Sequence, residues 1–459
     1  MEKNEIITVV CENIGTQGEG IAHCGDTVVF VPYLLYGESA RVKLLKVKNN
    51  VAYGKIEELL TPAEERTRPQ CGVFYRCGGC QLQHCNYRTQ LKFKTTLVRE
   101  TLKKIGGIEA EVLSCERSDK QYGYRNKLQL PVARQNGENV VGFFAERSHR
   151  IVPTHECPIH PEWSAKLIEA LYDFMDKCGL DGYDEETGRG QIRHIVVREL
   201  KNRYIVTLVV TEDIKGIDYF FYLLDNIFPE YSFYLNFNRK QTNVVFGEEF
   251  KLLRGKGFYE CVDGGILFEA GANTFVQVNE YVRGKLYDKI VSLADERVTA
   301  VDCYAGGGLL TAMLAKKCKK AVGIEIIPEA NACADKVRDR NDLSDKMVNY
   351  CGAVETLLDE VLQKESDAFV VLDPPRAGVE RNVLRVLQTR GVKTIFYVSC
   401  NPATLARDLG ILTGTLTENE KGELIKGNGQ GLYDVTLVQP YDMFPQTKHV
   451  ETLVMLQRK

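Results

Sequence analysis

The fold class is decided by the stretch Val301-Asp302-Cys303-Tyr304-Ala305-Gly306-Gly307-Gly308. Its first half completes a strand predicted over residues 299–304, and its glycines open the helix that follows. Glycines at a strand-to-helix turn permit positive φ angles and a close approach of a ligand to the backbone. Glu325 ends the next predicted strand about 20 residues later, where an acidic side chain can hold ribose hydroxyls. Dinucleotide and adenosylmethionine pockets share this pattern, but Leu309 and Leu310 occupy the place of the last glycine of a dinucleotide fingerprint.

Strands and helices continue to alternate towards the C-terminus. A helix is expected over 281–293, strands over 321–325, 368–373, 394–399, 433–438 and 451–456, and helices after Pro328 and Glu380. Repeated strand–helix units are typical of a parallel, doubly wound sheet. We therefore expect an α/β protein with a Rossmann-like domain over residues 271–459, whose first helix starts near residue 279.

The N-terminal part of the chain has a different pattern. Apolar and polar residues alternate over residues 1–60, which predicts a small antiparallel β-barrel. This barrel is either a solubilising module or an oligonucleotide-binding barrel with basic strands. After a polar linker, residues 70–270 mix short strands with helices, including a helical segment over 86–106, and are typical of a central α+β domain.

Composition limits the functional classes. The chain has 459 residues, 44% of them apolar, a formal net charge of −3 and 15 cysteines. Its apolar stretches fall short of the roughly 20 residues that a membrane helix needs, and its first residues do not resemble a secretory signal. We therefore expect a cytoplasmic protein with no membrane partner. The odd number of clustered cysteines favours metal binding or catalysis over disulfides.

Two motifs follow predicted strands of the C-terminal domain. Asp373-Pro374-Pro375-Arg376 ends one strand, and Ser399-Cys400-Asn401-Pro402 ends another. The carboxyl ends of strands are where open α/β sheets keep their active sites. Cys400 is either a packed structural cysteine or a nucleophile whose thiolate is stabilised by the helix that begins at Pro402.

A thiol at this position suits methylation of a pyrimidine at carbon 5. That carbon is a weak nucleophile until a thiolate adds to carbon 6, and a base must afterwards remove the proton from carbon 5. Glu451, at the start of the last apolar strand, is the candidate base. It is otherwise a carboxylate at a strand edge, and His449 is the alternative base.

Across nearly its whole length the chain resembles the RNA uracil-5 methyltransferases that use S-adenosylmethionine and carry a TRAM domain. The matching motifs are Cys71-x5-Cys77-Gly-Gly-Cys80 with Gln83-His84, Gly123 to Lys127, Phe275 to Asn279, Asp302 to Gly308, Asp373 to Arg376, Ser399 to Pro402 and His449 to Thr452. The resemblance implies a TRAM barrel, a central domain and a methyltransferase domain. Leu309-Leu310 departs from members that have a polar residue after the glycines.

The resemblance also implies roles for individual residues. Cys400 would be the nucleophile and Glu451 the base, and the cofactor contacts would be Gln277, Tyr304, Glu325 and Asp373. Cys71, Cys77, Cys80 and Cys157 would bind an iron–sulfur cluster of the 4Fe-4S type. From spacing alone, three cysteines within ten positions and a distant Cys-Pro pair are compatible with a cluster or with structural zinc.

The expected partner is RNA, with the target uridine flipped out or single-stranded so that its carbon 6 can meet the thiol. Arg125 and Lys127 are candidate RNA contacts near the site. The resemblance favours 23S ribosomal RNA, and transfer RNA is the alternative. A noncatalytic RNA-binding protein and a methyltransferase of another base remain rival interpretations. We expect a monomer.

Overall fold

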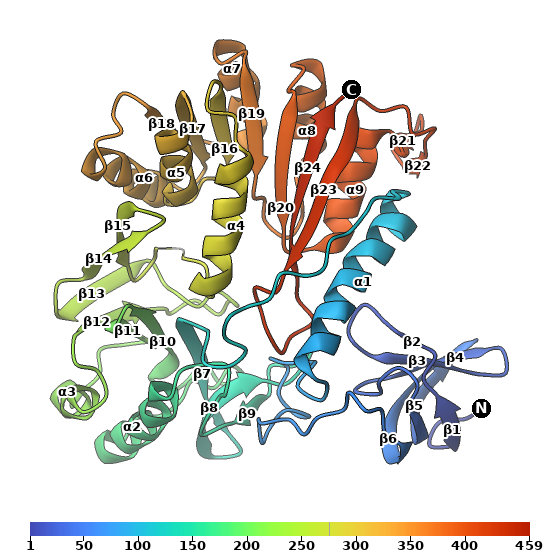
Figure 1. The fold of residues 1–459 in the computed structure, drawn as a ribbon. Coiled ribbons are helices and arrows are strands. Elements are labelled where there is room, and N and C mark those ends of the chain that lie inside the picture. The colour runs from blue at the N-terminus through green and yellow to red at the C-terminus, as the bar shows by residue number, and fades with distance from the viewer. Residues whose placement is uncertain (275) are drawn as a thin grey trace.

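A computed structural model describes residues 1–274 and 276–459. Phe275, the first residue of the motif 275–279, lies outside the described residues. The chain forms three large sheets, and the mixed α/β architecture predicted from the sequence is confirmed (Figure 1). Among the described helices, none is long and apolar enough to cross a membrane.

The C-terminal sheet has seven strands in the order β18-β17-β16-β19-β20-β24-β23. They are β16 (Thr299–Cys303), β17 (Lys320–Glu325), β18 (Met347–Cys351), β19 (Ala368–Leu372), β20 (Thr394–Ser399), β23 (Tyr433–Tyr441) and β24 (Glu451–Arg458). The strands β16 to β20 are parallel, and β24 and β23 complete the sheet in antiparallel fashion. The predicted strands are all present. The edge strand β18 was not predicted, because it is short and carries the polar Asn349.

Helices cover both faces of this sheet. One core contains side chains from α4 (Glu280–Leu293), α5 (Leu309–Lys317) and α6 (Pro328–Arg340). The opposite core contains side chains from α1 (Tyr87–Gly106), α7 (Val354–Lys364), α8 (Arg381–Thr389) and α9 (Pro402–Thr413). The sheet is therefore doubly wound. The long helix α1 comes from the first quarter of the chain but lies beside α9 and β23 (Figure 1).

The N-terminal residues form a six-stranded sheet in the order β1-β5-β6-β4-β3-β2. The strands are β1 (Ile6–Val10), β2 (Asn13–Ile14), β3 (Gly20–Cys24), β4 (Thr27–Val31), β5 (Ser39–Lys48) and β6 (Val51–Thr61). All pairs are antiparallel except β4 with β6. The sheet closes around a small apolar core that includes Val29, Val42 and Leu44. This module projects from the body of the molecule (Figure 1).

A second seven-stranded sheet has the order β13-β12-β11-β10-β7-β8-β9. Its strands are β7 (Lys127–Gln135), β8 (Glu138–Phe144), β9 (Ile151–Pro153), β10 (Ile192–Leu200), β11 (Arg203–Val210), β12 (Tyr231–Phe237) and β13 (Glu249–Arg254), with α2 (Trp163–Cys178) and α3 (Ile217–Asp225) packed on it. The hairpin of β14 (Phe258–Asp263) and β15 (Ile266–Gly271) packs instead into the core beside α5 and α6. A small hairpin, β21 (Leu416–Glu418) and β22 (Leu424–Lys426), follows α9.

Candidate active site

The two segments predicted to carry the reacting side chains meet at one end of the C-terminal sheet. Ser399, the last residue of β20, is paired with Thr452 of β24. Continuing this antiparallel register by one residue places Cys400 opposite Glu451. The predicted nucleophile and base, far apart in the sequence, are therefore neighbours at the end of adjacent strands.

Hydrogen bonds tie the loop that carries Cys400 to the Asp-Pro-Pro-Arg loop. Asn401 is the N-cap of α9, and its side-chain oxygen accepts a hydrogen bond from the backbone N–H of Ala403. Its Nδ2 donates to the carbonyl oxygen of Arg376 at 3.0 Å, and Oγ1 of Thr404 donates to the same oxygen at 3.3 Å. The ends of β19 and β20 are thus held together around the half-buried Cys400.

The electrostatics at Cys400 differ from what the sequence suggested. Proximity to the N-terminus of α9 favoured a stabilised thiolate, but burial raises the pKa of the Cys400 thiol. The nearby carboxyls of Glu451 and Asp373 raise that pKa further, and the Arg376 guanidinium lowers it in part. The direction is opposite to the expectation because the expectation considered the helix alone, and neither the burial of the thiol nor the acidic groups that the sheet brings to the same place.

Burial shifts both of these acidic groups, Asp373 and Glu451, towards their neutral forms. Burial raises the pKa of Asp373 to about 7. Burial, and then the proximity of Asp373, raises the pKa of Glu451 well above its ordinary value, against a lowering by Arg376. Burial likewise lowers the pKa of His449, the rival base, to about 4. This end of the sheet therefore brings together two buried carboxyls, and a cationic ligand beside them would favour their ionised forms.

The glycine loop, residues 304–308, follows β16, whose Asp302 lies near Asp373. Tyr304 follows β16 with a φ of 64°, and its hydroxyl donates a hydrogen bond to Glu355 at 2.9 Å. The carboxylate of Glu325 accepts hydrogen bonds from the backbone N–H groups of Gly306, at 2.9 Å, and Ile327, at 2.8 Å. A side chain at Gly308 would come within 2.6 Å of Ala334, so glycine is required there.

Gln277 lies in the segment that leads into α4. Its carbonyl oxygen accepts a hydrogen bond from Nδ2 of Asn126 at 3.1 Å, and its side chain is half-buried. Asn279, at the N-cap position of α4, is buried and donates to Oγ of Ser118 and to the carbonyl oxygen of Met443. Gln277 and Asn279 therefore tie the start of α4 to the central part of the chain and to the connection between β23 and β24.

Three residues of the site were given no role by the sequence analysis. Arg376 lowers the pKa of both Cys400 and Glu451. Asp302 is buried and accepts a hydrogen bond from Thr311 at 2.6 Å. Burial also raises the pKa of Tyr287 on α4, and Asp373 adds to that rise. The acidic Asp302 inside an apolar strand was a signal that could have been used, whereas nothing local distinguishes Tyr287.

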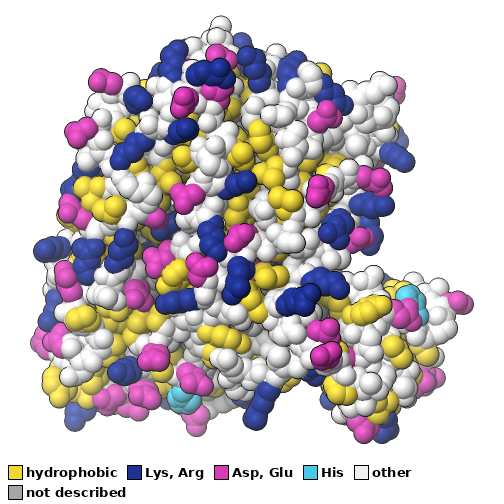
Figure 2. Space-filling view, in the orientation of Figure 1, with side chains coloured by type: hydrophobic (Ala, Val, Ile, Leu, Met, Phe, Trp, Pro, Cys, Tyr) yellow, Lys and Arg dark blue, Asp and Glu magenta, His cyan; other side chains and the backbone are white. Residues whose placement is uncertain are grey.

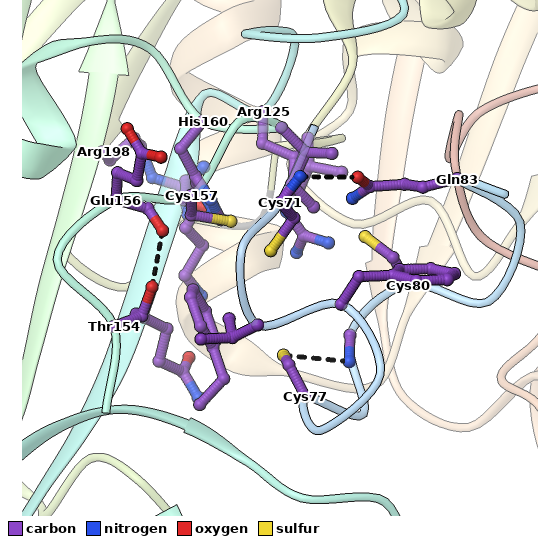
Figure 3. Close-up of a pocket in the computed structure, with 18 of the residues that line it drawn as sticks. Cys71, Cys77, Cys80, Gln83, Arg125, Thr154, Glu156, Cys157, His160 and Arg198 are labelled. Atoms are coloured by element: carbon purple, nitrogen blue, oxygen red, sulfur yellow. Dashed lines mark hydrogen bonds between the residues drawn. The ribbon is translucent and has the colours of Figure 1, made fainter. Parts of the chain in front are cut away.

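The four predicted ligand cysteines line one cavity of about 350 Å³ (Figure 3). Cys71, Cys77 and Cys80 come from one loop, and Cys157 faces them from the segment after β9. The sulfur of Cys77 accepts a hydrogen bond from the backbone N–H of Gly79 at 3.3 Å. As the side chains stand, the described residues contain no group of three or more His, Cys, Asp or Glu side chains that could hold a metal ion.

Basic side chains border the same cavity. Arg125, Lys127 and the buried Arg198 are among its lining residues, as are Val276 and Val278 from the segment before α4. Burial, with the proximity of Arg198 and Arg125, lowers the pKa of Lys127 to about 8. Arg125 and Lys127, the predicted RNA contacts, therefore line the cavity that contains the four cysteines.

Comparisons with known proteins agree with this architecture. The family model for tRNA (uracil-5-)-methyltransferase matches residues 86–459, and the model for the TRAM domain matches residues 2–56. An uncharacterized RNA methyltransferase of Clostridium tetani is 36% identical, over 99% of this chain and 97% of the relative. Another from Halalkalibacterium halodurans is 34% identical, over 100% of this chain and 98% of the relative.

A solved structure has a similar fold over the whole chain. The crystal structure of the Pyrococcus abyssi tRNA (uracil-54, C5)-methyltransferase in complex with S-adenosyl-L-homocysteine aligns with a TM-score of 0.74. The sequence identity is 26%, and the alignment covers 98% of this chain and 99% of that chain.

Proposed function

The chain belongs to the tRNA (uracil-5-)-methyltransferase family, and on that premise we propose that it methylates carbon 5 of a uridine in RNA with S-adenosylmethionine as donor. The observation that carries the proposal is the position of Cys400 opposite Glu451 in the β20–β24 register. A nucleophile and a base within reach of the same pyrimidine ring are what addition and elimination at that ring require.

The proposed reaction begins with addition to the uracil ring and ends with elimination from it. The Cys400 thiolate adds to carbon 6 of uracil, and the displaced electron pair makes carbon 5 nucleophilic. Carbon 5 then bonds to the methyl carbon, while the sulfonium sulfur keeps the electrons of the broken bond. Glu451 removes the proton from carbon 5, the double bond re-forms, and the thiolate leaves.

The residues beside the glycine loop fit the methyl donor. Glu325 ends β17 next to the open backbone of Gly306 and would hold the ribose hydroxyls. Tyr304, Gln277 and Asp373 would supply the remaining contacts. The buried acidic group at the strand ends suits the positive sulfonium, because a cation compensates carboxylates that are otherwise costly to ionise.

The donor chemistry of the four cysteines suits a soft metal centre. Thiolates are the ligands that iron–sulfur clusters and structural zinc prefer, and all four line one cavity. We propose a 4Fe-4S cluster there, with zinc as the alternative; when bound, the centre would hold the loop together. Purified protein should contain iron and absorb visible light. Cys157→Ala should lose both, and the matched variant Cys178→Ala, outside the cavity, should keep them.

The proposed target is a uridine of 23S ribosomal RNA, which the four cysteines and the TRAM barrel favour through the resemblance noted in the sequence. Transfer RNA is the second candidate, because the Pyrococcus abyssi protein of similar fold acts on it. Lys and Arg side chains gather where the barrel meets the body, which supports an RNA track at this junction (Figure 2). Mass mapping of both RNAs, from cells with and without the gene, discriminates the two targets.

Trapping on RNA that contains 5-fluorouridine tests the chemistry itself. Fluorine at carbon 5 cannot leave as a proton does, so the enzyme should remain covalently attached to the RNA in the presence of the methyl donor. Cys400→Ala should give no adduct, and Cys351→Ala, which replaces an exposed cysteine of β18, should be trapped like the wild type. Absence of an adduct with the wild type would favour a noncatalytic RNA-binding protein.

A further inference from the structure

The segment that carries three of the four clustered cysteines is hydrogen-bonded to the connection that precedes Glu451. We call residues 71–85 the cysteine segment and residues 442–450 the base loop. The backbone N–H groups of Gln81 and Leu82 donate to the carbonyl oxygen of Gln446 at 3.1 and 3.0 Å. The side-chain oxygen of Gln81 accepts from the backbone N–H of Lys448 at 3.3 Å. Two chain segments far apart in the sequence thus form one hydrogen-bonded unit.

Gln446 has an unusual backbone conformation at this contact. Its φ is 72°, in the left-handed region that non-glycine residues rarely adopt, and the residue is buried. A residue in this region costs on the order of 1 kcal/mol or more and persists only where its surroundings fix it. The bonds from the cysteine segment are therefore part of what keeps the base loop in its observed path.

Helix α1 joins the same contact through Gln90. Its buried side-chain nitrogen faces three oxygens, the carbonyls of Leu82 and Cys85 at 3.1 Å and the side chain of Gln446 at 3.0 Å. Its side-chain oxygen accepts from the backbone N–H of Gln446 at 3.0 Å. One amide therefore fastens the cysteine segment and the base loop to each other.

We propose that Gln81, Gln90 and Gln446 are positioning residues that connect the cysteine segment to the base Glu451. The inference rests on the proposed function, in which Glu451 removes the proton from carbon 5. Glu451 is the first residue of β24 and follows the base loop directly, so a shift of Gln446 moves the carboxyl relative to Cys400. Through this contact the cysteine segment would influence a reaction that involves no electron transfer.

The proposal predicts that the two halves of the reaction respond differently. Addition of the thiolate and methyl transfer depend on Cys400 and the donor contacts, and among the described residues the hydrogen bonds of the three glutamines reach neither. Proton removal depends on the position of Glu451, and a shift of about 1 Å in a catalytic group can cost up to a hundredfold in rate. A loosened base loop should therefore leave methylated RNA attached to Cys400.

The test uses the full-length protein as purified, RNA made with ordinary uridine, and S-adenosylmethionine. Gln90→Glu keeps the size of the side chain but replaces the amide donor with an acceptor that faces three oxygens. Turnover should fall roughly tenfold, and covalent protein–RNA adduct on a denaturing gel should rise several-fold over wild type. Gln81→Ala, on the half-buried loop, should show the same pattern more weakly.

The controls separate this role from a general loss of structure and from a failure of the proposed function. Thr96→Ala, at an exposed position of α1, should behave like the wild type, and adding Cys400→Ala to either variant should abolish the adduct. If the variants lose turnover without adduct, or keep wild-type turnover, the positioning role is rejected. If wild type forms no adduct even with 5-fluorouridine RNA, the proposed function fails and this inference with it.

Discussion

Cys400 and Glu451 lie opposite each other at the end of the β20–β24 pair, one residue beyond the paired Ser399 and Thr452. The antiparallel strand β24 is what makes this possible, because it begins at the edge where the parallel strands β19 and β20 finish. A purely parallel sheet would have placed the start of its last strand at the opposite edge. The proposed chemistry therefore depends on the direction of β24.

We predict that Glu451→Gln separates methyl transfer from product release. The amide keeps the shape of the carboxyl but cannot take the proton from carbon 5, so turnover should fall by about a hundredfold or more. With ordinary RNA and methyl donor, most of the protein should be recovered as a covalent adduct on a denaturing gel. Glu360→Gln, on the exposed side of α7, serves as the control. Normal turnover by Glu451→Gln would exclude this residue as the base.

We predict that the affinity for the methyl donor falls as the pH drops below about 7. Burial raises the pKa of Asp373 to about 7, so the group is largely ionised at pH 8 and largely protonated at pH 6. A cationic donor binds the ionised form better, and its dissociation constant, measured by calorimetry, should rise up to about tenfold per pH unit below the pKa. Asp373→Asn should bind weakly at both pH values. A wild-type affinity independent of pH would contradict the assignment.

The sequence predicted those parts of the site that follow from local patterns. The glycine turn at Gly306, the acid at Glu325 and the thiol at Cys400 each mark the end of an apolar strand, and each lies at the predicted edge. The sequence could not predict the raised pKa of Cys400, because this shift depends on burial and on two carboxyls, those of Glu451 at the start of β24 and Asp373 after β19. Nor could it place α1, since the contacts of its buried Lys94 lie near the other end of the chain.

We predict that the stability of the free protein decreases as pH rises from about 4 to 7. Burial raises the pKa of Asp302 to about 7, and the proximity of Asp373 and Glu325 adds to the rise. An unfolded aspartate has a pKa of about 3.9, so the folded state binds the proton more tightly and loses this advantage as pH rises through 7. Asp302→Asn should flatten this part of the pH profile in urea unfolding. An unchanged profile would show that Asp302 is not the group responsible.

We predict that breaking the buried ion pair between Lys94 of α1 and Asp442 strongly destabilises the protein. Both side chains are fully buried, and Nζ of Lys94 also donates to the carbonyl oxygen of Phe444 at 3.0 Å. Lys94→Met leaves a buried carboxylate without its partner, which should lower the free energy of unfolding by about 3–5 kcal/mol. Urea denaturation measures this, with Lys92→Met, at an exposed position of the same helix, as the control. The double variant Lys94→Met/Asp442→Leu should recover part of the loss, since no unpaired charge remains; equal losses in Lys94→Met and Lys92→Met would contradict a structural role for the pair.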